Sequence, residues 1–215
     1  AYAVGSRSLE KAKVFAAEHE VAKAYGSYEE LVADDSVDLI YIGTPHSEHY
    51  ENARLAIEHG KPVLCEKAFM ANAKQAKEIV ALARAKKVFM TEAIWTRYMP
   101  SRKMIDEIIT SGEIGEITSV SANLGYDIKG NERIVSPALA GGALLDVGIY
   151  PLTFISMVLG DEVQKISSTC TKTETGVDEL NAAVLEYPNR KLAFMHSGML
   201  GATDQYGIVY GTKGY

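Results

Sequence analysis

The N-terminal 94 residues alternate short apolar runs with amphipathic stretches, and this alternation restricts the chain to few folds. Three apolar runs are typical of short buried strands: "VDLIYIGTP", "PVLCE" and "VFMTEA". The stretches between them, "HSEHYENARLAIEHG" and "NAKQAKEIVALARAKK", have the periodicity of helices. Strands that are separated by crossover helices form a parallel sheet with helices on both faces. Residues 1–94 are therefore predicted to form part of a doubly wound α/β domain.

The beginning of the chain lacks a feature that such domains have when they bind a dinucleotide. They open with a strand and a G-x-G-x-x-G turn, whose backbone approaches the pyrophosphate. This chain has no such turn and no initiator Met, and it opens on "AYAVGSRS", which resembles the second strand. Its last residues, "VYGTKGY", stop within a predicted strand and turn. We therefore expect a partial Rossmann domain in a chain that is cut at both ends, and weak or no NADPH binding by these residues alone.

The pattern changes after Ala93. A helix that ends near Gly112 is followed by the alternating run "EITSVSANLGYD" and by "GGALLDVGIYPLTFISMVLG", which is predicted to be a buried helix entered through a glycine pair. Long alternating runs follow up to the end of the chain, and turn residues join them. Residues 95–215 are predicted to form an α+β domain with an open, mainly antiparallel sheet, incomplete at its C-terminus, for the substrate and for dimerisation.

Charge and cysteine content exclude several classes of protein. The formal net charge is -6 and the pI is about 5.4, so nucleic acid and anionic membranes are not expected partners. No apolar run is long enough to span a membrane, and the start has no signal-peptide layout, so a cytoplasmic protein is expected. Cys65 and Cys170 lie far apart without a CxxC pattern. They are predicted to be reduced, buried thiols.

The end of the first strand, Ser6-Arg7-Ser8, bears on the choice of cofactor. In a dinucleotide-binding domain an acidic residue here accepts hydrogen bonds from the ribose of NAD and repels a 2′-phosphate. A guanidinium with neighbouring hydroxyls suits a phosphate instead. The sequence therefore favours NADP over NAD, with Ser6 and Arg7 as ligands of the phosphate. The alternative is an exposed surface arginine before a capped helix.

Three segments together resemble one family of enzymes: "GTPHSEHYENARLAIEHGKPVLCEK", "EAIWTRYMP" and "GGALLDVGIYPLTFISMVLG". The chain resembles the glucose-fructose oxidoreductase/inositol dehydrogenase family, known as Gfo/Idh/MocA, over nearly its whole length. Within the family it is most similar to the branch of dimeric dihydrodiol dehydrogenases, which also oxidise D-xylose with NADP. The resemblance implies a Rossmann domain, a second domain whose open sheet often forms a dimer interface, and hydride transfer between a nicotinamide cofactor and a sugar, polyol or diol.

The resemblance also implies the catalytic residues. Glu66 and Lys67 match the Glu-Lys-Pro turn of the family, in which the lysine lies at the catalytic centre. Ala68 replaces the usual proline and leaves this turn less rigid. Asp146 and Tyr150 match the Asp-x-x-x-His motif, with tyrosine in the last place as in the dihydrodiol dehydrogenase branch.

Further residues are implied to contact the cofactor. Thr44, Pro45 and His49 match the loop and helix start beside the nicotinamide ribose, and Glu66 and Lys67 are also expected near the cofactor. Trp95 and Arg97 match the segment that touches cofactor and substrate where the domains meet.

The chemistry of these residue types fits alcohol oxidation. A base must take the hydroxyl proton as the hydride leaves carbon. Tyr150 is predicted to transfer this proton, because the ammonium of Lys67 would stabilise its phenolate, and Asp146 is predicted to orient the substrate. Lys67 itself could be the base. Glu66-Lys67 could also be a solvated turn pair, and Tyr150 a packing residue.

A metal site is not expected. His46 and His49 are three residues apart on a predicted helix, but no third ligand and no HExxH pattern accompany them.

The sequence thus predicts an oxidoreductase that transfers a hydride between NADP and a CH–OH group of a sugar or vicinal diol, of the trans-dihydrodiol or D-xylose type. It is expected to be a homodimer through the C-terminal sheet. The alternatives are a non-catalytic homologue that binds a nucleotide or sugar, and a fragment competent only for folding or dimerisation.

Overall fold

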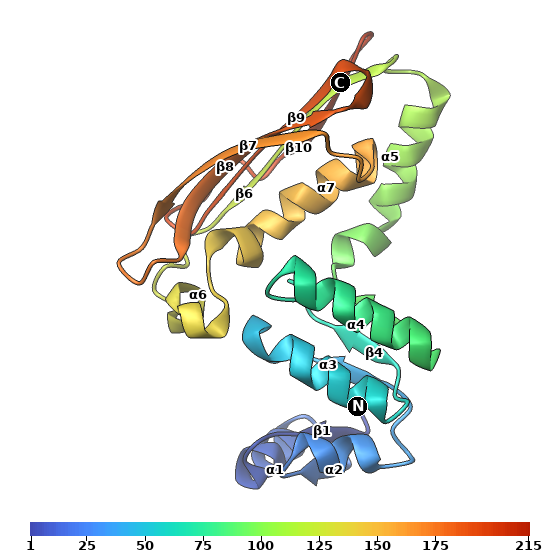
Figure 1. Ribbon diagram of the computed structural model, residues 1–215, viewed down its shortest axis with the longest axis vertical. Helices are drawn as coiled ribbons and strands as arrows, with labels where there is room; N and C mark the ends of the chain where they lie inside the picture. Colours follow the sequence, from blue (N-terminus) through green and yellow to red (C-terminus); the bar gives the residue numbers. More distant parts are fainter. The chain divides into compact units, whose positions relative to one another are not determined.

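The computed structural model of the chain describes residues 1–215, which form two compact units, Ala1–Ala93 and Ile94–Tyr215. Each unit has its own sheets and its own hydrophobic core (Figure 1).

The first unit contains five short parallel strands in two sheets. One sheet pairs β1 (Ala3–Gly5) with β2 (Lys23–Tyr25), and the other has the order β3 (Ile40–Ile42), β4 (Val63–Cys65), β5 (Met90–Glu92). The connecting helices are α1 (Leu9–Glu18), α2 (Tyr28–Ala33), α3 (His49–Glu58) and α4 (Ala73–Lys86), with a 3-10 turn, η1, at His46–Glu48. The predicted parallel α/β architecture is confirmed. Strand β2 was not predicted, because "KAY" is too short to show a pattern.

Side-chain caps define where the helices of the first unit begin. Ser8 Oγ accepts a hydrogen bond from the backbone N–H of Lys11, so Ser8 is the N-cap of α1. Asn72 caps α4 in the same way. After α3 the chain turns at Gly60, whose φ of 73° is the left-handed conformation that glycine adopts without strain.

A groove of about 710 Å³ lies between the two sheets of the first unit, lined by both β1 and β3. Strands β1 and β3 therefore each pair along one edge only. The groove explains why the apolar face of α1 is only half buried. Ala12 and Ala16 are buried, whereas Phe15 lines the groove and is 47% exposed.

The second unit is built on one five-stranded sheet in the order β10-β6-β9-β8-β7. Its strands are β6 (Ile117–Gly125), β7 (Lys165–Lys172), β8 (Asp178–Tyr187), β9 (Lys191–Gly198) and β10 (Gly207–Gly211). Strands β6 and β9 pair in parallel and all other neighbours are antiparallel, so the prediction of an open, mainly antiparallel sheet is confirmed. The parallel pairing of β6 with β9 was not predicted, because the alternation of apolar and polar residues does not show the relative direction of two strands.

The helical elements of the second unit come before and between the strands. Turn η2 (Trp95–Tyr98) and helix α5 (Pro100–Ser111) precede the sheet. The connection from β6 to β7 contains α6 (Glu132–Val135), η3 (Pro137–Leu139), the π-helical turn η4 (Leu144–Gly148) and α7 (Ile149–Leu159).

Helix α7 lies along one face of the five-stranded sheet (Figure 1). Ile155 is fully buried there with Val120 of β6 and Ala193 of β9. By length and composition alone, the helical stretch Pro137–Leu159 is long and apolar enough to cross a membrane. The C-terminal part of this stretch, α7, packs on the sheet, so a core helix also meets these criteria of length and composition.

The two cysteines differ in environment. Cys65 at the end of β4 is fully buried, and burial is the main cause that raises the pKa of its thiol to about 12. Cys170 on β7 is exposed, so the expectation that both thiols are buried is wrong for this residue. Strand β7 lies at an edge of the sheet, and all of its side chains are exposed.

Candidate active site

The loops that follow β3 and β4 lie side by side at one edge of the parallel sheet. The register pairs Ile42 with Cys65, and Cys65 with Glu92, so the three strands end level with one another. Thr44 and Pro45 follow β3, and Glu66-Lys67 follows β4, so all four lie at the carboxyl edge. This edge is where ligands bind in open parallel sheets.

His49 joins these two loops. Its ring is fully buried; Nε2 lies 2.9 Å from the carbonyl oxygen of Thr44, and Nδ1 lies 2.9 Å from the carbonyl oxygen of Ala68. A neutral imidazole can donate to only one of these two oxygens. His46, on the same face, has Nε2 at 3.2 Å from the carbonyl oxygen of Lys67. The two histidines thus contact the backbone carbonyl groups of Lys67 and Ala68.

Glu66 is held by two donors within the first unit. The hydroxyl of Tyr41 donates to Oε1 at 2.6 Å, and the backbone N–H of Lys67 donates to Oε2 at 3.1 Å. The hydrogen bond to Glu66, followed by burial, raises the pKa of Tyr41 to about 12. The carboxylate of Glu66 is thereby fixed at the turn. The Lys67–Ala68 peptide bond is cis.

Ser6 and Arg7 follow β1 at the carboxyl end of the other parallel sheet. Ser6 Oγ accepts the backbone N–H of Ser8 at 3.3 Å, which leaves the Ser6 hydroxyl proton available to a ligand. The side chain of Arg7 is exposed.

In the second unit, Asp146 and Tyr150 lie where η4 continues into α7. Asp146 is buried, with 6% of its surface exposed, and its Oδ1 lies 3.0 Å from Arg133 Nη2. The indole N–H of Trp95 donates to the hydroxyl oxygen of Tyr150 at 3.2 Å, and the two ring centres are 6.0 Å apart. The carboxylate of Asp146 and the phenol of Tyr150 therefore lie on consecutive helical segments, η4 and α7. Each of the two groups has a polar partner.

Trp95 contacts the beginning of α7 at Tyr150, and Arg97 contacts the same helix further along, at Ser156. Arg97 Nη2 donates to Ser156 Oγ at 3.1 Å, and Ser156 in turn donates to Asp161 at 2.5 Å. Trp95 is 55% exposed although it contacts Tyr150. A large, accessible aromatic surface therefore lies beside the phenol.

Some residues that shape this site were not predicted. Tyr41 and Arg133 hold Glu66 and Asp146, but they stand 25 and 13 residues away from them in the sequence. Neither separation corresponds to a helix or strand period, so no pattern could have identified these pairs. No group of three or more His, Cys, Asp or Glu side chains in the structure could hold a metal ion.

A parallel α/β unit, followed by a unit on one open, mixed sheet, is the architecture of two-domain, dinucleotide-dependent oxidoreductases. Residues 1–93 match the family model described as oxidoreductase family, NAD-binding Rossmann fold, of the Gfo/Idh/MocA proteins. Residues 102–215 match the model of the Gfo/Idh/MocA C-terminal domain. The chain belongs to the Gfo/Idh/MocA family, as its sequence motifs predicted.

Curated relatives and a solved structure agree with this assignment. The chain is 42% identical over 213 residues to the trans-1,2-dihydrobenzene-1,2-diol dehydrogenase of Sus scrofa, covering 99% of this chain and 64% of the relative. It is 44% identical over 201 residues to the NADP-dependent D-xylose 1-dehydrogenase of Hypocrea jecorina, covering 85% of this chain and 51% of that protein. The crystal structure of KijD10, a 3-ketoreductase from Actinomadura kijaniata, with NADP and TDP-benzene superimposes with a TM-score of 0.90 at 26% identity, covering 99% of this chain and 66% of that one. The chain thus spans less than two thirds of the length of the two curated relatives.

Proposed function

We propose that the protein transfers a hydride between NADP and a CH–OH group of a sugar or vicinal diol. The observation that carries this proposal lies at the start of α7, where the hydroxyl oxygen of Tyr150 accepts a hydrogen bond from Trp95 and the preceding turn carries the buried carboxylate of Asp146. A phenol and a carboxylate are groups that can take and orient the proton of an alcohol. The similarity to a dihydrodiol dehydrogenase and a xylose dehydrogenase supports this class of substrate.

The first unit is proposed to bind the cofactor, and the second to contact the substrate. The loops of the first unit fit a dinucleotide because Thr44, Pro45, Glu66 and Lys67 share the carboxyl edge of one parallel sheet. His49 is buried, so its proposed task is to hold the two loops in place rather than to touch the cofactor. When bound, NADP supplies the nicotinamide carbon that gains or loses the hydride.

Tyr150 is proposed to carry the proton of the substrate hydroxyl. The indole N–H of Trp95 points at the phenol oxygen, and a donor in this position favours the phenolate. The ammonium of Lys67 is proposed to add a positive charge that stabilises the phenolate and polarises the substrate oxygen. Lys67 as the base itself is the alternative, and the experiments on Lys67 and Tyr150 below distinguish the two.

Asp146 is proposed to orient the substrate by accepting a hydrogen bond from one of its hydroxyl groups. Arg133 stands 3.0 Å from one carboxylate oxygen, which favours the ionised form of this buried group. Trp95 and Arg97 are proposed to line the substrate side of the site, where the exposed indole offers an apolar face to a sugar or diol ring.

The direct test is turnover by the purified full-length protein. We expect NADPH absorbance to rise when NADP is mixed with D-xylose or with a trans-dihydrodiol of benzene. Binding of NADPH without turnover of either compound, or of related aldoses, would favour a non-catalytic binding protein over the enzyme proposed here.

The preference for NADP over NAD is proposed to depend on Arg7, with a contribution from Ser6. Replacing Arg7 by Asp should weaken NADP binding roughly 10- to 100-fold, since a charge-assisted hydrogen bond to a phosphate is lost and repulsion is added. Binding of NAD, which has no 2′-phosphate, should change far less. Dissociation constants of NADPH and NADH, measured by fluorescence titration of Arg7→Asp and wild type, check this prediction. Equal losses for both cofactors would contradict it.

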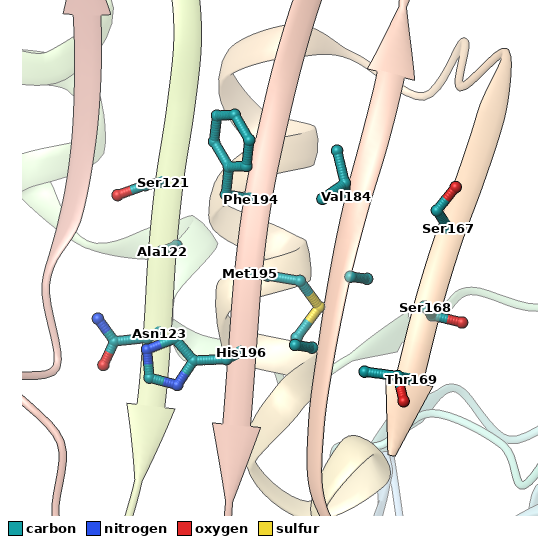
Figure 2. A pocket seen from close by; sticks show the side chains of 12 residues that line it. Ser121, Ala122, Asn123, Ser167, Ser168, Thr169, Val184, Phe194, Met195 and His196 are labelled. Atoms are coloured by element: carbon teal, nitrogen blue, oxygen red, sulfur yellow. The ribbon is translucent and has the colours of Figure 1, made fainter.

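The exposed face of the five-stranded sheet is proposed to bind a second copy of the chain. Leu180, Val184, Leu192 and Phe194 are between 36% and 44% exposed on this face, so apolar area is open to water. Figure 2 shows Phe194 and Val184 beside the small side chains of Ser121 and Ser167. A flat, apolar sheet face with short polar neighbours can pack against an identical face across a twofold axis.

Replacing Phe194 by Glu should convert a dimer into a monomer, because the charge would be buried between the two sheets. The control is Ile166→Glu, which adds the same charge on the opposite face, since Ile166 pairs with core residue Leu185. Analytical ultracentrifugation of both variants measures the effect. A monomeric wild type, or loss of the dimer in both variants, would count against this interface.

The cellular compartment is proposed to be the cytoplasm. The exposed Cys170 is a free thiol, and an exposed free thiol persists best in a reducing compartment.

A further inference from the structure

The π-helical turn that carries Asp146 is fastened to the sheet at both of its ends. At its beginning, the backbone N–H of Leu144 donates to Asp178 Oδ2 at 2.7 Å. At its end, Gly148 lies against Ser197 of β9, so closely that a Cβ on Gly148 would come within 2.6 Å of Ser197 Oγ. Both anchors are polar side chains of the sheet, and neither belongs to the residues assigned above to the chemistry.

A third side chain connects the two anchors. Asn181 of β8 donates from Nδ2 to Asp178 Oδ2 at 2.7 Å, and its Oδ1 accepts the hydroxyl of Ser197 at 2.8 Å. Because a carboxylate only accepts and the serine hydroxyl is the donor here, only one orientation of the Asn181 amide satisfies both partners. Asn181 is 9% exposed and Ser197 is fully buried, so these bonds are shielded from water.

The backbone at the entry to the turn is adapted to the same carboxylate. A Cβ on Gly142 would collide with Asp178 Oδ1, and Gly142 has a φ of 117°, which strains other residues. The glycine pair noticed in the sequence therefore leaves room for Asp178. The close approach at Gly148 leaves room for Ser197 in the same manner.

These contacts support a turn, Leu144–Gly148, that is π-helical. A π-helical turn is less favourable than an α-helical one and needs support from its surroundings. If the turn relaxed to a regular α-helix, the residues before the removed bulge would rotate by about 100° around the helix axis relative to α7. Asp146 lies within the turn, so its carboxylate would move relative to Arg133 and to the start of α7, where Tyr150 lies.

We propose that Asp178, Asn181 and Ser197 form a positioning relay that fixes the π-helical turn and so aims Asp146 and Tyr150 at the substrate. The proposal rests on the proposed function for its effect on rate, but the contacts of the relay stand independently of it. These three residues are positioning residues, since they act through the turn and not on the substrate.

The test uses Asn181→Leu, Ser197→Ala and the control Thr173→Val. Asn181→Leu keeps the size of the side chain and removes both hydrogen bonds, whereas Ser197→Ala removes one bond and is the milder change. Thr173 is also a buried polar residue of this unit, but its hydrogen bonds stay within the β7–β8 connection. The control therefore reports the cost of losing a buried hydroxyl that does not touch the turn.

The first readout is the fluorescence of Trp95, which is the only tryptophan of the chain and bonds to Tyr150. Both relay variants should shift its emission in the direction that Tyr150→Phe does, and Thr173→Val should leave it unchanged. This readout does not need turnover. If the wild type turned over no substrate, the proposed function would fail while the relay would still be tested.

The second readout is the rate. In Asn181→Leu we expect kcat to fall roughly 10- to 100-fold, the loss that misplaced reacting groups produce, with the KM for NADP unchanged. In the background of Asp146→Ala the same substitution should have little further effect, because the side chain that the turn carries is already absent. Should Asn181→Leu fail to fold, Ser197→Ala decides. Unchanged Trp95 emission together with wild-type kcat in Ser197→Ala would overturn the proposal, as would fully multiplicative losses in the double variant.

Discussion

Replacing Lys67 by Met is expected to lower kcat roughly 100- to 10,000-fold, the contribution of a positioned proton-transfer group or its activating charge. Methionine keeps most of the length of the side chain and removes the ammonium. The turn should retain its shape, because the backbone around Lys67 is held by His46 and His49 through carbonyl oxygens and not through the lysine side chain. The KM for NADP should therefore change much less than kcat. Steady-state rates with D-xylose and NADP measure both quantities.

The matched control is Lys74→Met in the same unit. Its side chain is 84% exposed on α4, where it stands 4.0 Å from Glu78. Exposed pairs of this kind contribute little to stability, so this variant should behave like the wild type. If Lys67→Met kept more than about a tenth of the wild-type kcat, Lys67 would be neither the base nor the activating charge.

Replacing Tyr150 by Phe is expected to produce a loss of similar size, because the substitution removes one oxygen and leaves the ring against Trp95. The pH dependence assigns the role. If Tyr150 is the proton-transfer group, the ionisation that limits kcat in the wild type should be absent in Tyr150→Phe. If Lys67 is the base, that ionisation should persist in Tyr150→Phe and vanish in Lys67→Met. Rates measured across a pH series for the two variants distinguish these assignments.

Tyr126→Phe is the control for this experiment. Tyr126 is an exposed tyrosine of the second unit, whose hydroxyl stands 3.4 Å from Gln205. A loss in Tyr126→Phe as large as that in Tyr150→Phe would show that removal of a tyrosine hydroxyl from this unit affects turnover indirectly.

Elements with a clear period were predictable from the sequence. Helix α4 was predicted by its amphipathic pattern and β6 by its alternation, because burial on one side imposes these periods. The π-helical turn at Leu144–Gly148 was read as the start of a continuous helix, since a π-helical turn changes one hydrogen bond pattern without changing the composition. Strand β2, with three residues, was too short to show any period.

The residues of the site likewise differ in whether a sequence pattern identifies them. Lys67, Asp146 and Tyr150 were identified because they occur in motifs that resemble those of a family. Tyr41, Arg133 and Asp178, which bond to Glu66, Asp146 and the backbone of Leu144, were not identified, because each reaches its partner through the fold from a distant part of the chain. Side-chain partners of this kind depend on strand register and on the path of loops, which a single sequence does not contain.

Hydride transfer from a CH–OH group to NADP is tested most directly by following one hydrogen atom from the substrate to the cofactor. The purified protein is mixed with NADP and with D-xylose that carries deuterium on its anomeric carbon, and the NADPH formed is analysed by mass spectrometry; a dihydrodiol deuterated at its CH–OH carbons serves as second substrate. We expect NADPH that carries one deuterium atom with at least one of these compounds. Unlabelled NADPH, or bound NADP that is reduced by neither compound, would contradict it.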